Sequence, residues 1–173
     1  DAGWRLRSEA RLETKIQSLG AALDLPERGG YADSIGAKLE RADIDRWILS
    51  VLQSLVRDVN AEMEAYRLYT VVPRLVAFID DLTNWYVRRS RARFWKSEDD
   101  RDRANAFATL YEVLTTFSTV LAPFMPFLTE TVYQKLVRPV DGSAPASIHW
   151  CDYPQADASM IDINPLLGIH AAV

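Results

Sequence analysis

Cationic and aromatic side chains crowd into one short stretch of the sequence, residues 80–96, where their types and spacing could support chemistry. The cations are Arg88, Arg89, Arg91, Arg93 and Lys96, and the interleaved aromatic residues are Trp85, Tyr86, Phe94 and Trp95. A guanidinium group can bond two phosphate oxygens at once, and an indole ring can stack on a base or brace an arginine. The combination favours binding of a nucleic-acid backbone, and no carboxylate between Leu82 and Ser97 opposes it.

Helical spacing separates this stretch into two outer stripes and one inner face. At about 100° per residue, the first stripe contains Asn84, Arg88, Arg91 and Trp95. The second stripe contains Arg89, Arg93 and Lys96. Leu82, Tyr86 and Phe94 are left to face inward, and Trp47 and Trp85 fit core or supporting positions. The residues of the two stripes are those that we predict to contact nucleic acid.

Two plainer interpretations of the same cations remain open. The arginines could form a solvated helix end, because cations are favoured near the negative end of a helix dipole. Alternatively, Arg89 or Arg93 could pair with Asp80, with Asp81 or with the acidic run at 98–102 across a helix junction.

The sequence contains no arrangement of residues that we expect to catalyse a reaction. Asp80 and Asp81 are adjacent on a predicted helix, so their side chains diverge by about 100°, and one of them is expected to pair with an arginine. His149 and Cys151 supply too few ligands for a zinc site, and both are expected to have structural roles. The sequence also has no glycine-rich phosphate loop and no nucleophile–base–acid set.

Composition indicates one soluble globular domain. The 173 residues are 49% hydrophobic and 25% charged, and the formal net charge of −4 means that an anionic partner must meet a local basic patch. One cysteine allows no internal disulfide, and no apolar run approaches the roughly 20 residues of a membrane span. We expect a cytoplasmic monomer. Because the sequence starts at Asp1 instead of methionine, we also expect it to be a piece of a larger protein.

Hydrophobic periodicity predicts an all-α fold, an antiparallel bundle of four main helices with short connections. The helices begin near Asp43, near Tyr69 and Thr70, at 97–100 and at Pro126. Asp43 is the predicted cap of the first helix, Asp45 lies on its polar side, and Pro73 falls in the first turn of the second helix. Residues 97–100 form a predicted capping box for the third helix.

The predicted inner faces follow three- and four-residue steps. In the first helix they are Ile44, Trp47, Ile48, Val51, Leu52, Leu55, Val56, Val59, Met63 and Tyr66. In the second they are Val72, Leu75, Val76, Ile79, Leu82 and Tyr86. In the third they are Phe107, Leu110, Val113, Leu114, Phe117, Val120 and Leu121, and in the fourth Phe127, Leu128, Val132, Tyr133, Leu136 and Val137.

The pattern is weaker on either side of the bundle, which we place at residues 43–155. Residues 1–42 are predicted to form an N-terminal helix, with apolar residues at 12, 16, 19 and 23, followed by a loop linker. Residues 147–150 are predicted to be extended. Residues 156–173 are predicted to contain the start of a helix, capped by Asn164 with Pro165 in its first turn.

The run Asp-Asp-Leu-Thr-Asn-Trp-Tyr-Val-Arg-Arg-Ser-Arg-Ala-Arg-Phe-Trp at 80–95 resembles the characteristic helix of the anticodon-binding domain of isoleucyl-tRNA synthetases. Three flanking pieces resemble the same family in the same order: residues 45–50, residues 121–127 with Glu130, and residues 147–150 with Asp152 and Pro154. The resemblance covers about residues 43–155. Related valyl, leucyl and methionyl enzymes share the bundle, but the Asn-Trp-Tyr-x-Arg-Arg-Ser-Arg run points to the isoleucine enzyme.

The resemblance implies a class I synthetase, an isoleucine–tRNA ligase that joins isoleucine to its tRNA through an ATP-made aminoacyl-adenylate. The family's ATP-site motifs, His-Ile-Gly-His and Lys-Met-Ser-Lys-Ser, are absent from this sequence. ATP with magnesium, and the zinc of many members, therefore belong to the longer enzyme, and this chain alone should be inactive and bind no cofactor. The implied partners are isoleucine tRNA, held by its backbone along the anticodon stem or inner corner, and the catalytic and C-terminal domains of the same enzyme.

Two alternative functions stay open. One is a helical protein-interaction module whose arginines dock an acidic surface, which the net charge of −4 and the acidic run at 98–102 keep in consideration. The other is the same domain of another branched-chain synthetase, such as the valyl enzyme.

Overall fold

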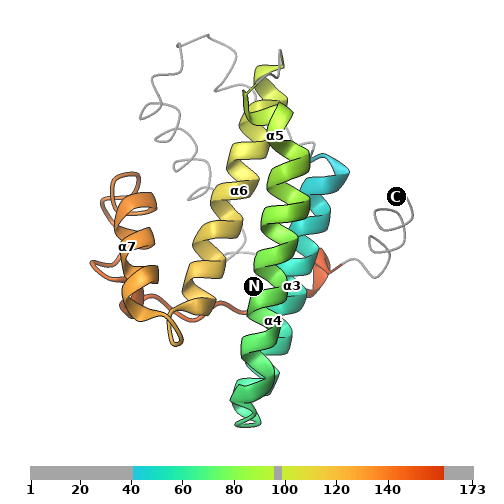
Figure 1. Ribbon diagram of the computed structural model, residues 1–173. Helices are drawn as coiled ribbons and strands as arrows, with labels where there is room; N and C mark the ends of the chain where they lie inside the picture. Colours follow the sequence, from blue (N-terminus) through green and yellow to red (C-terminus); the bar gives the residue numbers. More distant parts are fainter. Residues whose placement is uncertain (1–40, 96–98, 162–173) are drawn as a thin grey trace.

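A computed structural model describes residues 41–95 and 99–161, and within these ranges the chain forms helices and connections without a strand (Figure 1). The α-helices are α3 (Asp43–Glu64), α4 (Leu68–Asp80), α5 (Arg88–Trp95), α6 (Asp100–Leu121) and α7 (Pro126–Leu136). A π-helical segment, η1 (Asp81–Val87), joins α4 to α5, and two 3-10 turns follow α7, η2 (Ile148–Trp150) and η3 (Ala158–Met160). The predicted all-α helical bundle is confirmed.

Three long rods enclose the main core: α3, the continuous rod α4–η1–α5, and α6 (Figure 1). The side chains that fill this core include Trp47, Ile48, Leu52, Phe78, Leu82, Tyr86, Val113, Phe117 and Val120. Helix α7 is the short fourth member and packs beside the C-terminal end of α6. It has a small core of its own, made by Ala122, Tyr133, Val137, Ala144 and Ile148.

Both ends of α3 differ from the prediction. Asp43 is the first helical residue and does not cap the helix, since the N-cap is Ala42 and no side chain bonds there. Tyr66, predicted to be in the core, lies beyond the helix with φ of 58° and is 91% exposed. A left-handed residue is needed here because it lets the Tyr66 and Arg67 N–H groups donate to the Met63 and Glu62 carbonyls while the chain reverses.

Helix α4 buries a different face from the predicted one. Leu75 is buried as predicted, but its buried companions on α4 are Val71 and Phe78, whereas Val72, Val76 and Ile79 are exposed. Both sets have helical spacing, so periodicity alone does not choose between them. The large Phe78 ring decides the outcome, because its centroid packs 4.8 Å from that of Phe117 on α6.

The start of α4 also lies earlier than predicted, at Leu68. Pro73 is consequently inside the helix, in its second turn, and not in the first turn. The ring is tolerated there on the exposed side, where the carbonyl that loses its helical donor can bond to water.

The N-cap of α6 lies two residues after Ser97, the first residue of the capping box that the sequence predicts. Asp99 is the N-cap, and its carboxylate accepts hydrogen bonds from the Arg101 and Asp102 backbone N–H groups at 2.9 and 3.4 Å. Residues 97 and 98 of the predicted box lie outside the described residues. The acidic character of the first turn, with Asp100 and Asp102, matches the positive end of the helix dipole.

Helix α7 buries only part of its predicted core face. Tyr133 and Val137 are buried, but Phe127 is 88% exposed and Leu128 is 49% exposed. The covering residues Ala144 and Ile148 reach only the later turns of α7, so its first turn projects past them.

Residues 147–150 form a turn and are not the predicted extended segment. Ser147 is extended, but Ile148–Trp150 is a 3-10 turn capped by the Ser147 hydroxyl, which accepts from the His149 N–H at 3.2 Å. Glu130 of α7 holds the turn by accepting from the Ser147 hydroxyl at 2.8 Å and the Ile148 N–H at 3.0 Å.

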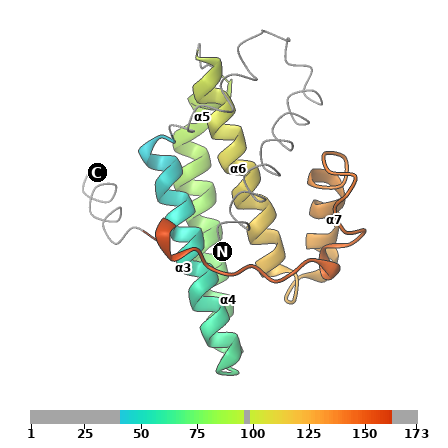
Figure 2. The same ribbon diagram turned by 180° about the vertical axis from the view of Figure 1, so that it is seen from behind.

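After this turn, residues 151–160, named here the strap, pass the C-terminal end of α6 and cross from α7 to α3 (Figure 2). The Asn60 side-chain amide donates to the Pro154 carbonyl at 3.1 Å, and the Gln53 side-chain oxygen Oε1 accepts from the Asp157 N–H at 2.9 Å. The Tyr153 hydroxyl donates to the Val120 carbonyl at 3.1 Å. The strap therefore ties α7 and α6 to α3.

Residues 1–40 of the predicted N-terminal helix and linker, and the predicted helix start at Asn164, lie outside the described residues. Among the residues that are described, no helix has both the length and the apolar character required to span a bilayer.

Candidate nucleic-acid interface

The basic stretch occupies the second half of the α4–η1–α5 rod, and its inner side follows an unusual spacing. The buried residues are Val71, Leu75, Phe78, Leu82, Tyr86, Ser90 and Phe94, which are four apart from Phe78 onward. In an uninterrupted α-helix each four-residue step overshoots a full turn by about 40°, so four such steps would rotate Phe94 away from the core by about 160°. The wider π-helical segment η1 absorbs this drift and keeps all of these residues inside.

The π-helical segment was not predicted, although its signal is present in the sequence. Phe78, Leu82, Tyr86 and Phe94 fall on a strict four-residue repeat, which a regular α-helix of 3.6 residues per turn cannot keep on one face. Segments of this kind occur often at functional sites, because they change the direction in which the following side chains point.

The outer side of the rod carries an exposed surface named here the basic face, which consists of Asn84, Arg88, Arg89, Arg91 and Trp95. The Arg91 guanidinium lies 5.8 Å from the Trp95 ring, and Trp95 is 72% exposed. The Arg89 guanidinium lies 4.9 Å from the Trp85 ring, which is half-buried against the core. Trp85 thus has the predicted supporting position, and Trp47 the predicted core position at 1% exposure.

The three arginines of the basic face keep their charge available. Within residues 41–95 and 99–161, Arg88, Arg89 and Arg91 take part in no ion pair. Each is exposed, so each guanidinium can reach an anion without first leaving a carboxylate. The plainer interpretation of Arg89 as an ion-pair partner finds no support among the described residues.

Asn84 is held in place by a neighbour one turn back. Its amide donates a hydrogen bond to the Asp80 carboxylate. Asp80 is therefore bound to Asn84, and not to an arginine, among the described residues. The side-chain carbonyl oxygen of Asn84 takes no part in this hydrogen bond.

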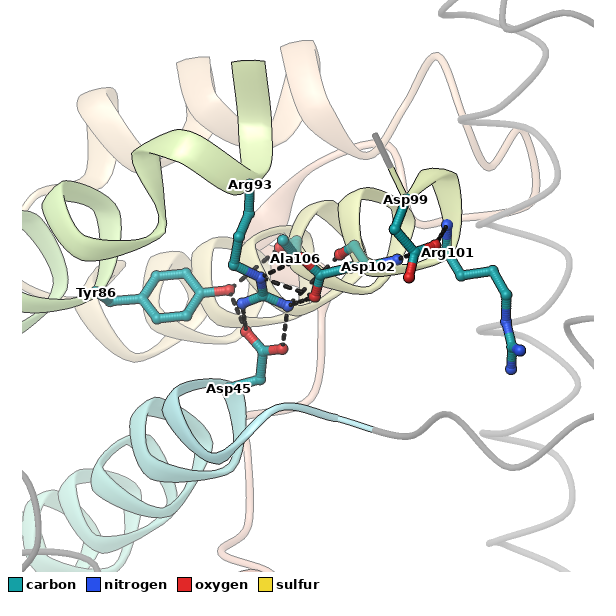
Figure 3. Close-up of polar contacts among 7 residues, drawn as sticks. All are labelled: Asp45, Tyr86, Arg93, Asp99, Arg101, Asp102 and Ala106. Carbon is teal, nitrogen blue, oxygen red and sulfur yellow. Dashed lines mark hydrogen bonds and ion pairs between the residues drawn. The ribbon is translucent and has the colours of Figure 1, made fainter. Parts of the chain in front are cut away.

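Arg93, predicted in the second outer stripe, points into the bundle instead (Figure 3). Its Nη1 and Nη2 atoms donate to the two Asp45 carboxylate oxygens at 2.9 and 2.8 Å. Its Nε lies 2.9 Å from both oxygens of Asp102, and Nη2 lies 2.6 Å from one of them. The predicted alternative, pairing with the acidic run at 98–102, is what the geometry shows for Arg93.

Asp45 is the functional residue that sequence reasoning misplaced. It was assigned to the polar side of α3, yet it is 0% exposed. In addition to the bonds from Arg93, Asp45 accepts a hydrogen bond from the Tyr86 hydroxyl at 2.8 Å. Side chains of both η1 and α5 therefore bind this one carboxylate. The available signal was its alignment with the buried Leu49 and Leu52, four and seven residues later on the same helix.

The ionisation of this cluster follows from its contacts. The hydrogen bonds that Arg93 donates to Asp45, and after them those to Asp102, raise the pKa of Arg93 above its usual value, so the guanidinium is charged at every pH of interest. Burial raises the pKa of Tyr86, and the adjacent Asp45 charge raises it further, so the phenol stays protonated and donates. The cluster is therefore one cation between two carboxylates.

The remaining candidate residues lie apart from the basic face. Lys96 is outside the described residues. Cys151 is half-buried, and its thiol lies 3.6 Å from the Tyr133 hydroxyl, in the structural role expected of it. His149 is exposed in η2. In the described part of the chain no three His, Cys, Asp or Glu side chains gather in a way that could hold a metal ion.

Comparison with known sequences finds a family match over most of the chain. The sequence model of the anticodon-binding domain of tRNA ligases matches residues 45–170. This range contains the basic face, the Asp45–Arg93–Asp102 cluster and the strap.

Individual relatives agree with the family match. The chain is 53% identical over 125 residues to an isoleucine–tRNA ligase of Chlamydia muridarum, which covers 72% of this chain and 12% of the relative. It is 55% identical over 116 residues to the enzyme of that name from Chlamydia trachomatis serovar D, covering 67% of this chain and 11% of the relative. The chain is 49% identical over 133 residues to an isoleucine–tRNA ligase of Chlamydia abortus. This match covers 76% of this chain and 12% of the relative. The chain thus spans about one eighth of the length of these curated relatives.

Proposed function

Because this chain belongs to the family of anticodon-binding domains of tRNA ligases, we propose that its basic face binds the phosphate backbone of isoleucine tRNA. The proposed contact residues are Asn84, Arg88, Arg89, Arg91 and Trp95, with Lys96 as a further predicted member. The observation that carries the proposal is the group of three exposed arginines that share no ion pair among the described residues. Arg93 is left out, because its guanidinium is already bound by Asp45 and Asp102.

The chemistry of the face suits this role. Arg88, Arg89 and Arg91 present planar forks that match phosphate oxygens, and Asn84 can bond a phosphate or a ribose hydroxyl. Trp95 either stacks on an exposed base or holds Arg91 in position through the ring contact. Since the chain carries a net charge of −4, this attraction is local, and it directs the RNA to one side of the bundle.

The longer enzyme is proposed to be an isoleucine–tRNA ligase, as the relatives' names suggest. In that enzyme the bundle would position tRNA for ATP-dependent isoleucylation, with ATP and magnesium used outside this chain. The proposed location is the cytoplasm. Charging isoleucine and valine tRNAs with the whole enzyme separates this assignment from that of a valyl enzyme, because only the cognate tRNA is expected to be aminoacylated.

A salt titration of tRNA binding tests the basic face. The chain is titrated with transcribed isoleucine tRNA at several salt concentrations, and the logarithm of affinity is plotted against that of salt. Each lost phosphate contact lowers the slope by about 0.7–0.9, so changing Arg88, Arg89 and Arg91 to Ala should lower it by about 2 to 3.

The matched control removes three other exposed arginines. Arg46, Arg57 and Arg74 each pair with an aspartate on α3, so their change to Ala alters the net charge equally without touching the basic face. For the control variant, the slope of log affinity against log salt should stay close to that of the wild type. Equal slopes for the two triple variants would exclude the basic face as the site.

A second candidate contact is another domain of the same longer protein, at α4. The exposed stripe Leu68, Val72, Val76 and Ile79 continues the basic face along the same rod and is apolar. Hydrogen exchange of α4 should be slower in the whole enzyme than in this chain if a domain covers the stripe. If tRNA fails to compete with a protein bound to the rod, the interaction-module alternative gains support instead.

A further inference from the structure

Arg93 lies on α5, the same eight-residue helix as the three arginines and Trp95 of the basic face, yet its side chain binds inward to Asp45 and Asp102 (Figure 3). Asp45 comes from α3, Arg93 from α5 and Asp102 from α6, so one guanidinium joins three separate helices. Asp45 is 0% exposed, and the Arg93 side chain is 16% exposed. Burying a charged group costs desolvation free energy, so its presence here calls for a functional explanation.

We propose that Asp45 is a positioning residue for RNA binding, which acts through Arg93 to fix the direction in which α5 presents Arg88, Arg91 and Trp95. This inference rests on the proposed function of the basic face. It assigns Asp45 and Arg93 to orientation and not to contact with RNA.

Charge excludes Arg93 as a phosphate ligand in this arrangement. Its Nε, Nη1 and Nη2 atoms all donate to carboxylates. The cluster of two aspartates and one arginine carries a formal charge of −1, which repels a phosphate. Any effect of Asp45 on RNA binding must therefore pass through the position of the helix.

Helix α5 needs such an anchor, because little else holds it. It has only eight residues, and of these only Ser90 and Phe94 are buried. It also follows the π-helical segment, whose wider turns give the next helix a different rotation from that in an uninterrupted α-helix. The two-bond fork from Arg93 to Asp45 fixes both position and rotation, since a bidentate pair tolerates little change in angle.

Two single variants of the full chain test this role with transcribed isoleucine tRNA. Asp45→Asn keeps the shape of the side chain and removes its charge, and Arg93→Lys keeps the cation and removes the fork. Both should weaken RNA binding on the order of tenfold, within the range of coupled contacts. If Arg93 contacted phosphate directly, Arg93→Lys would keep most of the affinity, and that result would overturn the inference.

A double-mutant cycle separates positioning from general damage. In a chain that already carries Arg88→Ala and Arg91→Ala, Asp45→Asn should cause a smaller loss of RNA affinity than it causes in the wild type, because two of the three side chains it positions are gone. Additive losses would overturn the inference. Val59→Ala is the control for lost stability: it removes buried volume elsewhere on α3, and should lower the melting temperature while leaving RNA affinity unchanged.

The cycle also distinguishes a failure of the proposed function from a failure of the positioning role. If Arg88→Ala with Arg91→Ala leaves tRNA binding intact, the proposed function fails, and the positioning role fails with it. If that pair weakens binding but Asp45→Asn and Arg93→Lys leave it unchanged, only the positioning role is wrong. Arg93→Lys serves where Asp45→Asn folds poorly, because the buried carboxylate then still has a cation beside it.

Discussion

Asp45 places a carboxylate at zero exposure, where Arg93 and Tyr86 both donate hydrogen bonds to it. Removing one partner of such a buried cluster costs more than the net value of the contact, since the remaining charge loses its compensation. The same side chains thus hold the bundle together and, in our proposal, orient its basic face.

The hydroxyl of Tyr86 offers a direct measure of this compensation. Tyr86→Phe keeps the ring but removes the donor to Asp45, and should lower the free energy of unfolding by about 1–3 kcal/mol. Urea denaturation measures the change.

Tyr111→Phe is the matched control. The Tyr111 hydroxyl is buried and finds no hydrogen-bond partner among the described residues, so its removal should be nearly neutral. A larger loss for Tyr111→Phe than for Tyr86→Phe would contradict the importance of the Asp45 contact.

The burial of individual residues was predictable where the packing of the core allowed only one arrangement. Trp47, Leu52 and Phe117 are buried as the periodicity predicts. Asp45 was misplaced because sequence reasoning assigns a carboxylate to the surface, and its burial depends on Arg93, which lies 48 residues away. The helical alignment of Asp45 with Leu49 and Leu52 is a local signal of its burial, but a partner so distant in sequence leaves none of its own identity.

At the scale of elements, η1 decides which side of the rod is outside. Without it, the four-residue repeat from Phe78 to Phe94 would turn the arginines gradually toward the core. Sequence periodicity predicted the rod but assumed regular turns throughout. It consequently named Val72, Val76 and Ile79 as inner residues of α4, whereas these are exposed.

The α3–α4 turn is stabilised by a polar cluster around Glu62. Its carboxylate accepts from Arg67 Nε at 2.7 Å and from the Thr70 hydroxyl at 2.7 Å. The Arg67 hydrogen bond, followed by that of Thr70, lowers the pKa of Glu62 to about 2. Neither contact was predicted, because both depend on the left-handed turn at Tyr66.

A lowered pKa gives a definite sign to the pH dependence of this turn. Glu62 stabilises the fold at pH values above about 4.5, where the unfolded carboxylate is also ionised, and the contribution is lost as pH falls toward about 2. The difference in unfolding free energy between the wild type and Glu62→Gln should therefore shrink across this interval. Glu64→Gln, an exposed change at the end of the same helix, is the control for removal of one carboxylate.

For the whole molecule, the sequence was sufficient for the fold class and insufficient for the connections after α7. Four helices and their order follow from periodicity, prolines and acidic helix starts. The strap does not, because its backbone bonds with Gln53 and Asn60 have no regular pattern. For the basic face, residue types suggested which side chains could bind RNA. Only the packing showed that Arg93 binds inward whereas Arg91 is exposed.

The strap has a consequence for the order of folding. Its contacts with α3 join residues 94 and 104 positions apart, whereas α3 and α4 meet across one short turn. Closing a long loop costs more chain entropy than closing a short one, so the hairpin of α3 and α4 should form first and the strap last.

Kinetics can detect this order. Changing Gln53 and Asn60 together to Ala should raise the unfolding rate by roughly tenfold while leaving the refolding rate nearly unchanged. Leu75→Ala, in the early α3–α4 contact, should instead slow refolding, and stopped-flow measurements over a range of urea concentrations give both rates. The strap then acts as a latch on a bundle that is already assembled, and it lengthens the lifetime of the folded chain without helping it to fold.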